Sequence, residues 1–399
     1  MNHVRVVLFT GKGGVGKTTA AAGTATLSAR AGRRTLVMST DAAHSLGDAF
    51  GTGAAPLGPE PTEIEPRLWV QQIDAQRRFE RSWAEIQGYL MSVLDAAGVD
   101  PITAEELTVI PGAEEVLALL ELRAHAIGDR WDVIVVDCAP TAETLRLLAL
   151  PEALGWYMTR VFPVERRVVK ALRPVLSRAA GVPMPGDSVF EAVQRLHDDL
   201  GEVQQILSGA SATVRLVLTP ETVVVAEARR SLTTLSLYGY RVDGVIANRV
   251  FPEGGGDAWR AGWVAAQRDV LAEVAESFPV VPVWRSSYQP GEPVGPDALA
   301  AFAAAAYGGD DPLAAPDGDG PLTITRTDTG AVLRIDLPFA TRADVDLARH
   351  GDELVVTVGS YRRLFALPAA LARHEVAGAR VDDGSLRVRF RIVQEATHG

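Results

Sequence analysis

The chain has 399 residues, 47% of them hydrophobic, which is enough for well-packed cores and, at about 150 residues per domain, for two or three domains. Its 39 basic and 50 acidic residues give a formal net charge of −11, which argues against nucleic acid or anionic lipid as a constitutive partner. The single cysteine, Cys138, excludes an intramolecular disulfide and a cysteine-based metal cage within one chain. No signal peptide or membrane-spanning run is evident, so we expect a cytoplasmic protein.

Short apolar runs recur through residues 1–307, and most of them lack alternation of polar and apolar residues. This pattern predicts strands that are buried on both faces of a mostly parallel sheet. A glycine loop follows the first run, and an alanine-rich helical stretch follows the loop. We therefore predict an α/β fold for this part, with strands near residues 4–9, 35–38, 131–136, 213–218, 242–247 and 280–284.

Two stretches with apolar residues at helical spacing interrupt the predicted sheet, within about residues 77–125 and 151–209. Two interpretations stay open at this point. The helices form ordinary amphipathic packing against the sheet, or they form a helical subdomain that presents an apolar groove.

The composition changes at residues 308–320, where the run GGDDPLAAPDGDG predicts a linker that buries nothing. Residues 321–399 then contain short β segments separated by turns, which predicts a small all-β sandwich domain. The expected strands are residues 322–327, 331–337, 345–349, 354–358, 363–366 and 385–392.

The glycine loop GKGGVGKTT, residues 11–19, fits the pattern GxxxxGK[ST] and lies between a predicted strand and a predicted helix. Its backbone N–H groups and the helix N-terminus form a cradle for an anion. Lys17 would contact the β- and γ-phosphates of a nucleotide, and Thr18 would hold Mg²⁺. The remaining predicted nucleotide-binding residues of the loop are Gly13, Gly14, Val15, Gly16 and Thr19.

Lys12 is unusual, because an ordinary phosphate loop needs no lysine directly after its first glycine. The loop resembles the deviant Walker A motif of the SIMIBI class of ATPases, in which this second lysine reaches the nucleotide of a partner subunit. The resemblance implies a homodimer that encloses nucleotide, with Lys12 and Lys17 both in catalytic roles.

The segment STDAAHSLGDAF, residues 39–50, resembles switch I of the branch that contains ArsA and the tail-anchored-protein targeting ATPases. The resemblance implies that Asp41 positions the attacking water. Asp48 would either complete the Mg²⁺ shell or cap a helix. Asp137 ends a predicted strand where a Walker B carboxylate would hold Mg²⁺, and residues 137–148, DCAPTAETLRLL, are similar to switch II of the same branch.

The same resemblance extends over residues 1–305. It implies that Glu221 and Glu227 face the partner subunit, although both also fit a solvated helix start. It implies that Asn248 reads the adenine edge and that Pro282 walls the base, so we expect ATP rather than GTP.

Two motifs of the resembled branch are absent from this sequence, and their absence limits the candidate functions. The cysteines that bind arsenite in pump ATPases are absent, which makes an arsenite pump subunit a poor candidate. The CxxC motif that clasps zinc between targeting-ATPase subunits is absent after Asn248, so we expect no zinc. A dimer would then depend on side-chain packing, for which Trp259 and Trp263 are candidates by location.

Residues 321–399 resemble an α-crystallin (small heat-shock) domain, in the runs VLRIDLPFATRADVDLARHGDELVVTVG, RRLFALPAAL and ARVDDGSLRVRF. Together, these observations predict a Mg²⁺-dependent ATPase that acts as a homodimer and binds hydrophobic client proteins. Tail-anchored membrane proteins are candidate clients, and a membrane receptor is a candidate partner; nucleic acid is not expected. The alternatives are a partition-type regulatory ATPase, an arsenite pump subunit, and a passive holdase with a vestigial ATPase part.

Overall fold

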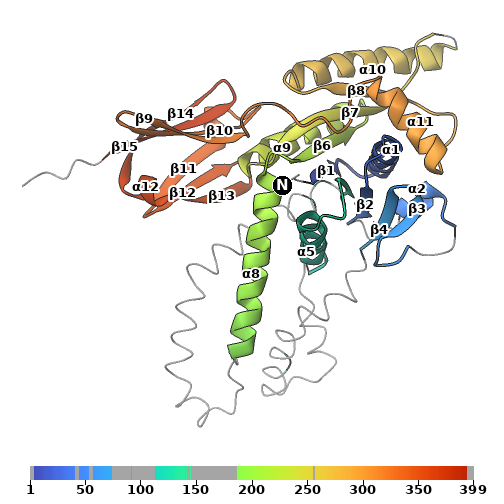
Figure 1. Ribbon diagram of the computed structural model, residues 1–399. Helices are drawn as coiled ribbons and strands as arrows, with labels where there is room; N and C mark the ends of the chain where they lie inside the picture. The colour runs from blue at the N-terminus through green and yellow to red at the C-terminus, as the bar shows by residue number, and fades with distance from the viewer. Residues whose placement is uncertain are drawn as a thin grey trace, which may run out of the picture.

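The structure is a computed structural model, which describes residues 4–40, 45–53, 57–73, 91, 113–139, 141, 144, 187–254 and 257–392. An eight-stranded sheet with helices comes first along the chain, and a sandwich of a four-stranded and a three-stranded sheet follows it (Figure 1). This arrangement confirms the predicted α/β fold followed by a small all-β domain.

The large sheet has the strand order β3-β4-β2-β5-β1-β6-β7-β8, and every neighbouring pair is parallel except β3 with β4. Every residue of β1, β2, β5 and β6 is buried, which explains why these runs lack polar alternation. The strands are β1 (Arg5–Thr10), β2 (Thr35–Ser39), β3 (Thr62–Glu65), β4 (Leu68–Gln72), β5 (Val133–Asp137), β6 (Ala212–Leu218), β7 (Val242–Val250) and β8 (Val283–Ser287).

Helices cover both faces of this sheet, because the crossovers from β1 to β2 and from β6 to β7 run in opposite directions across it and right-handed crossovers then place their helices on opposite faces. Helices α1 and α11 pack against each other, and α9 contacts β6, β7 and α10. Among the described residues, none of the helices is long and apolar enough to span a membrane. The helices are α1 (Lys17–Arg30), α2 (Ser45–Phe50), α5 (Ala113–Ile127), α8 (Asp187–Ser208), α9 (Thr222–Leu237), α10 (Ala258–Ser277) and α11 (Pro296–Tyr307).

Two of these helices, α5 and α8, lie in the stretches predicted to form the helical subdomain. They pack against each other, and Arg123 forms ion pairs with Asp199 at 3.1 Å and with Glu202 at 2.8 Å. Helix α8 has 22 residues, so it is about 33 Å long, and it extends well away from the sheet (Figure 1). The rest of the two predicted stretches lies outside the described residues.

The C-terminal sandwich contains the sheets β14-β15-β10-β9 and β11-β12-β13, which enclose their own apolar core. The sequence missed one strand, β14, in which the pairing with β15 is interrupted between Val376 and Gly378. The strands are β9 (Leu322–Thr327), β10 (Gly330–Asp336), β11 (Val345–His350), β12 (Glu353–Val358), β13 (Tyr361–Ala366), β14 (His374–Asp382) and β15 (Ser385–Ile392).

The sandwich is fixed to the C-terminal half of α9. Leu237, the last residue of this helix, is fully buried within the core of the sandwich. The buried Arg363 donates a hydrogen bond to the Leu237 carbonyl, and the Thr233 hydroxyl donates one to the Pro338 carbonyl. Because buried bonds and core packing both cross this boundary, the two parts form a continuous interface.

The tract 308–320 does more than connect the two parts, so the prediction that it buries nothing was wrong. Leu313 is only 7% exposed and belongs to the core of the large sheet. Its carbonyl accepts a 3.0 Å hydrogen bond from Nε of Arg5, and the Trp284 indole donates to Asp310 at 2.9 Å. These partners come from distant parts of the chain, so local composition carried no sign of them.

A buried charged network connects this tract to the sheet. Asp243 accepts hydrogen bonds from Arg5 at 2.9 Å and from Nη2 of Arg215 at 2.7 Å. Arg215 also donates to the Tyr307 hydroxyl at 2.9 Å, which lies 2.6 Å from the hydroxyl of Thr24 on α1. The network therefore joins the helix that follows the glycine loop to β1, β6, β7 and α11.

Candidate nucleotide site

The glycine loop between β1 and α1 is wrapped tightly against its neighbours. A Cβ atom added at Gly11 would lie 2.1 Å from the Val217 carbonyl oxygen, and one at Gly16 would lie 2.3 Å from Nδ2 of Asn248. Gly16 also has φ +96°, in the left-handed region that disfavours residues with a Cβ. Glycine is therefore required here for both backbone conformation and close packing.

The loop leads directly into α1, so the first N–H groups of the helix and its positive dipole end are available to an anion. Lys17, the first helical residue, is buried, and its ammonium group donates to the Lys12 carbonyl at 3.3 Å across the loop. The Lys12 side chain is exposed. Lys17 therefore belongs to the cradle of its own chain, whereas the Lys12 side chain lies on the surface.

Two predicted Mg²⁺ residues meet beside the loop. The Thr18 hydroxyl donates to Oδ2 of Asp137 at 2.8 Å, and the Oγ atom of Ser45 lies 3.2 Å from the Thr18 hydroxyl oxygen. These are hard oxygen ligands, and Mg²⁺ in phosphate sites takes few protein ligands beside water and phosphate oxygens, so the residues fit this metal. Asp48 lies one helical turn beyond Ser45 and is exposed, so the structure brings Ser45 to the pair instead. Ser45 was not predicted from the sequence, because its only signal was its position within the switch I segment.

The two switch segments are joined by hydrogen bonds. The backbone N–H of Thr40 donates to the Asp137 carbonyl at 3.0 Å, and the Thr40 hydroxyl accepts from the N–H of Ala139 at 3.2 Å. The starts of both switch segments are thus tied together at the edge of the sheet. Asp41 lies outside the described residues, and its role in positioning water stays a prediction.

Cys138 follows Asp137 and is buried, and its backbone N–H donates to the Phe9 carbonyl at 3.1 Å. Burial, followed by the nearby Asp137 carboxylate, raises the pKa of the Cys138 thiol. The thiol stays protonated at neutral pH, and thiolates are the form that attacks electrophiles and binds soft metals.

Asn248 lies against the glycine loop. Its Nδ2 donates to the Val15 carbonyl at 2.8 Å, and its Oδ1 accepts from the N–H of Arg249 at 2.9 Å. An asparagine amide has two N–H donors and two acceptor lone pairs, so one of each stays available after these bonds. The reading of adenine by Asn248 stays a prediction, and its support of the loop is an added structural role.

A cavity of about 410 Å³ adjoins the loop between Gly16, Asn248 and the segment 287–293. Thr19 also lines it, together with Phe302 of α11. Pro282, predicted to wall the base, lies instead at the amino end of β8, where its carbonyl accepts from Val245 at 2.9 Å. That prediction was wrong because β8 begins at Val283 rather than near residue 280. The turn that follows β8 therefore lies at the edge of the sheet that carries the glycine loop, and Pro282 lies at the other edge.

The two predicted partner-facing acids lie at and after the start of α9. Glu221 is exposed just beyond β6 at the same sheet edge as the loop, and one of its carboxylate oxygens accepts from the Thr219 hydroxyl at 3.1 Å. Glu227 is half-buried farther along the helix. Their roles toward a partner subunit stay predictions.

A mostly parallel sheet with this loop after β1 and a buried aspartate at the end of β5 defines a P-loop NTPase. The family of anion-transporting ATPases matches residues 4–308, and the HSP20-like domain found in ArsA proteins matches residues 328–390. The chain belongs to this ArsA ATPase family and carries its HSP20-like domain at the C-terminal end. The family is one of nucleotide-binding ATPases.

Relatives match over most of the chain. A protein of Chlorobaculum tepidum, provisionally named an arsenical pump-driving ATPase, is 35% identical over 399 residues, covering 99% of this chain and 98% of the relative. A protein of Streptomyces coelicolor, described as uncharacterised, is 40% identical over 389 residues and covers 97% of each chain. An ATPase named an ASNA1 homolog in Trypanosoma cruzi is 30% identical over 263 residues, covering 60% of this chain and 72% of the relative.

Proposed function

We propose that this protein is a Mg²⁺-dependent ATP hydrolase that works as a nucleotide-switched homodimer and binds hydrophobic segments of client proteins. The observation that carries the proposal is the pairing of Thr18 with Asp137 beneath the glycine loop, because it assembles the metal-holding groups of an ATPase. The second support is α9, which runs from the loop edge of the sheet to the core of the HSP20-like domain.

Each residue of the site has a role in this proposal. The loop N–H groups and Lys17 hold the phosphates, and Thr18 and Asp137 hold Mg²⁺, which neutralises charge on the phosphate oxygens when bound. Asp41 orients the attacking water. Asn248 and the cavity beside it accept the base.

The dimer is supported by an exposed aromatic cluster, defined here as Phe251, Trp259, Trp263 and Tyr288. Trp259 is 66% exposed, Trp263 is 44% exposed, and their ring centroids lie 6.1 Å apart. Phe251 stacks on Tyr288 with centroids 5.1 Å apart, and Tyr288 also lines the cavity beside the loop. Exposed apolar clusters of this kind mark interaction sites, and this one borders the nucleotide site where Lys12 would reach a partner.

The double variant Trp259→Asp/Trp263→Asp should abolish the ATP-dependent dimer, because buried carboxylates at the interface carry a large desolvation cost. Light scattering in Mg²⁺ and ATP should show one chain where the wild-type protein shows two. Ile324→Asp, which adds one acid at an exposed apolar position of the sandwich, is the control and should remain a dimer. A double variant that still dimerises would remove the aromatic cluster from the interface.

Client binding is supported by the extended helix α8 with α5 and by the attached HSP20-like domain. The apolar Ile127, at the end of α5, is 58% exposed. Because hydrogen bonds join α9 to the sandwich, a change at the nucleotide edge of the sheet can be transmitted to the sandwich through this helix. Tail-anchored membrane proteins, with a single apolar helix, are candidate clients.

The test is a pull-down from native lysate with the Asp41→Asn variant held in ATP and Mg²⁺, with Lys17→Ala as the control. We expect Asp41→Asn to retain proteins that carry an exposed apolar segment, and Lys17→Ala to retain few of them. Enrichment of proteins with one C-terminal apolar helix would support targeting, and a broad set of aggregation-prone proteins would support a general chaperone. Equal recovery with both variants would contradict a nucleotide-controlled client site.

The name of the Chlorobaculum tepidum relative favours a second candidate, an arsenite-stimulated pump subunit. Arsenite binds thiolates, and the only cysteine of this chain is the buried Cys138, whose pKa is raised. We expect arsenite to change ATP turnover less than about twofold, in the wild-type protein and in Cys138→Ser alike. Stimulation by arsenite that Cys138→Ser abolishes would favour the pump.

A further inference from the structure

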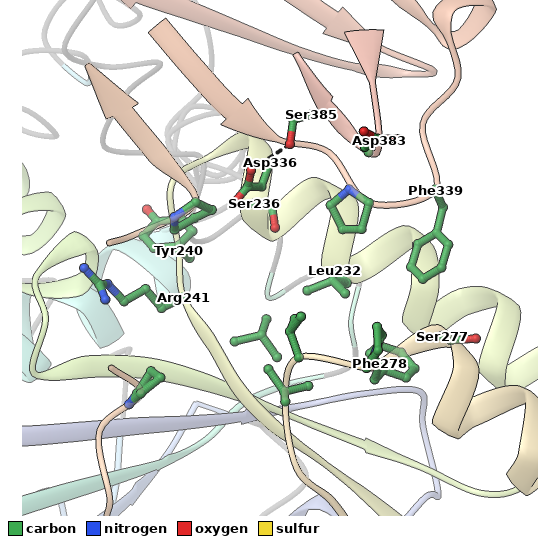
Figure 2. A pocket seen from close by; sticks show the side chains of 18 of the residues that line it. Leu232, Ser236, Tyr240, Arg241, Ser277, Phe278, Asp336, Phe339, Asp383 and Ser385 are labelled. Atoms are coloured by element: carbon green, nitrogen blue, oxygen red, sulfur yellow. Dashed lines mark hydrogen bonds between the residues drawn. The ribbon is translucent and has the colours of Figure 1, made fainter. Parts of the chain in front are cut away.

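A second cavity, of about 600 Å³, lies between the ATPase part and the sandwich (Figure 2). Its walls come from α9, the start of β7 and the turn after α10, together with the tract before β9, the end of β10 and the turn between β14 and β15. Leu232, Phe278, Val281 and Phe339 supply apolar surface. The volume and the position between two domains are typical of sites for small organic molecules.

Ser236 of α9 places a hydroxyl group at this cavity. Ser231 and Thr234 each donate a hydroxyl hydrogen bond to the carbonyl one turn earlier in α9, and the Thr233 hydroxyl donates to the Pro338 carbonyl. Ser236 is only 5% exposed, yet its hydroxyl makes no such bond and points into the cavity. A hydroxyl that lines the cavity and bonds to no other described group can hydrogen-bond to a polar group of a ligand.

The mouth of the cavity is negative. Arg334 is neutralised by Asp336 at 2.8 Å. Arg241 donates to the Gly318 carbonyl at 2.7 Å and keeps its positive charge. Four acidic side chains that line the cavity have no ion-pair partner among the described residues: Glu276, Asp317, Asp319 and Asp383. The excess of unpaired carboxylates favours a cationic group at the mouth.

We propose that this cavity binds an amphipathic organic cation, a molecule with an apolar body and a protonated amine. The apolar body lies against Phe278 and Phe339, and a hydrogen-bonding group near it reaches Ser236. The amine lies at the mouth beside Asp319 and Asp383. The lining of this cavity shares no residue with that of the cavity beside the glycine loop, so the proposal does not depend on the proposed ATPase activity.

The test uses two dansyl probes on the full-length protein, monodansylcadaverine with a protonated amine and dansyl-6-aminohexanoate with a carboxylate. Fluorescence titration should show saturable binding of the amine to one site per chain, at least about tenfold tighter than the acid. In Asp319→Asn/Asp383→Asn this preference should fall to about twofold or less. Asp328→Asn/Asp346→Asn removes the same charge from exposed positions outside the cavity and should keep the preference.

Two further variants locate the probe. Leu232→Trp should abolish binding by filling the cavity, and Lys17→Ala should bind the amine as the wild-type protein does. Equal affinity for the two probes, or a preference that the Asp319→Asn/Asp383→Asn variant keeps, would overturn the proposal. Loss of the amine probe in Lys17→Ala would place it at the nucleotide site and would overturn the proposal as well.

Discussion

Lys17→Ala should lower ATP turnover at least about 100-fold, because the variant removes a side-chain cation that is buried in the phosphate cradle. A loss of this size equals about 3 kcal/mol of transition-state stabilisation. The measurement is steady-state phosphate release in Mg²⁺ and ATP, with circular dichroism to confirm that the variant is folded. The Lys17 side chain makes a single hydrogen bond to the loop in the structure, so the fold should persist without it.

Arg33→Ala is the matched control for Lys17→Ala. Arg33 is exposed just after α1, at the opposite end of this helix from the glycine loop, so its removal changes the net charge equally without altering the cradle. Its turnover should stay within about twofold of the wild-type value. If Lys17→Ala kept wild-type turnover, the glycine loop would not be the site of hydrolysis.

Asp243→Ala should lower the free energy of unfolding by about 3–5 kcal/mol, the cost of leaving buried charges without their partner. Asp243 is the carboxylate between the guanidinium groups of Arg5 and Arg215, and all three residues are buried. The measurement is urea denaturation of the full chain followed by tryptophan fluorescence. Loss of Asp243 should also weaken the attachment of the tract 308–320 to the sheet. Asp243 holds the Arg5 guanidinium group, and Arg5 donates to the Leu313 carbonyl.

Asp346→Ala removes an exposed carboxylate from β11 and should change the free energy of unfolding by less than about 0.5 kcal/mol. Asp243→Asn keeps the shape of the side chain and should fall between the wild-type protein and Asp243→Ala, which keeps the test usable if the alanine variant fails to fold. A loss below about 1 kcal/mol in Asp243→Ala would show that water or neighbouring residues compensate the two arginines.

The central strands were predictable from the sequence because both of their faces are buried. A strand such as β5 is apolar along nearly all its length, and a short, valine-rich run of this kind is typical of the middle of a parallel sheet. The glycine loop was predictable for a different reason. The spacing of its glycines and of Lys17 is the one that a backbone cradle for phosphate requires.

The edge of the sheet was harder to predict, and β3 and β4 were missed. In β4, Gln71 and Gln72 are polar but buried, and Gln71 donates to the Pro59 carbonyl and to Glu121 at 2.7 and 2.8 Å. Side-chain hydrogen bonds to distant residues replace the apolar surface that sequence patterns detect. For the same reason, the burial of Leu313 could not be read from its Gly/Pro/Asp surroundings.

Within the site, the motif residues were found and the residues that complete it were not. Thr18 and Asp137 belong to recognisable motifs and meet as expected. Ser45 and the cavity segment 287–293 come from short turns whose position depends on where a helix or strand begins. The predicted start of β8 was three residues too early, and this error led to the wrong prediction that Pro282 packs against the nucleotide base.

Nucleotide control over the binding of apolar segments is central to the proposed function, and the affinity of the wild-type protein for such a segment tests it most directly. The probe is a fluorescein-labelled helical peptide of about 20 apolar residues, a length that matches a membrane-spanning helix. The readout is fluorescence anisotropy in Mg²⁺ with ATP, with ADP or without nucleotide. We predict binding at least about tenfold tighter with ATP than with ADP, and no such difference in Lys17→Ala. Equal affinity of the wild-type protein in all three conditions would contradict nucleotide control.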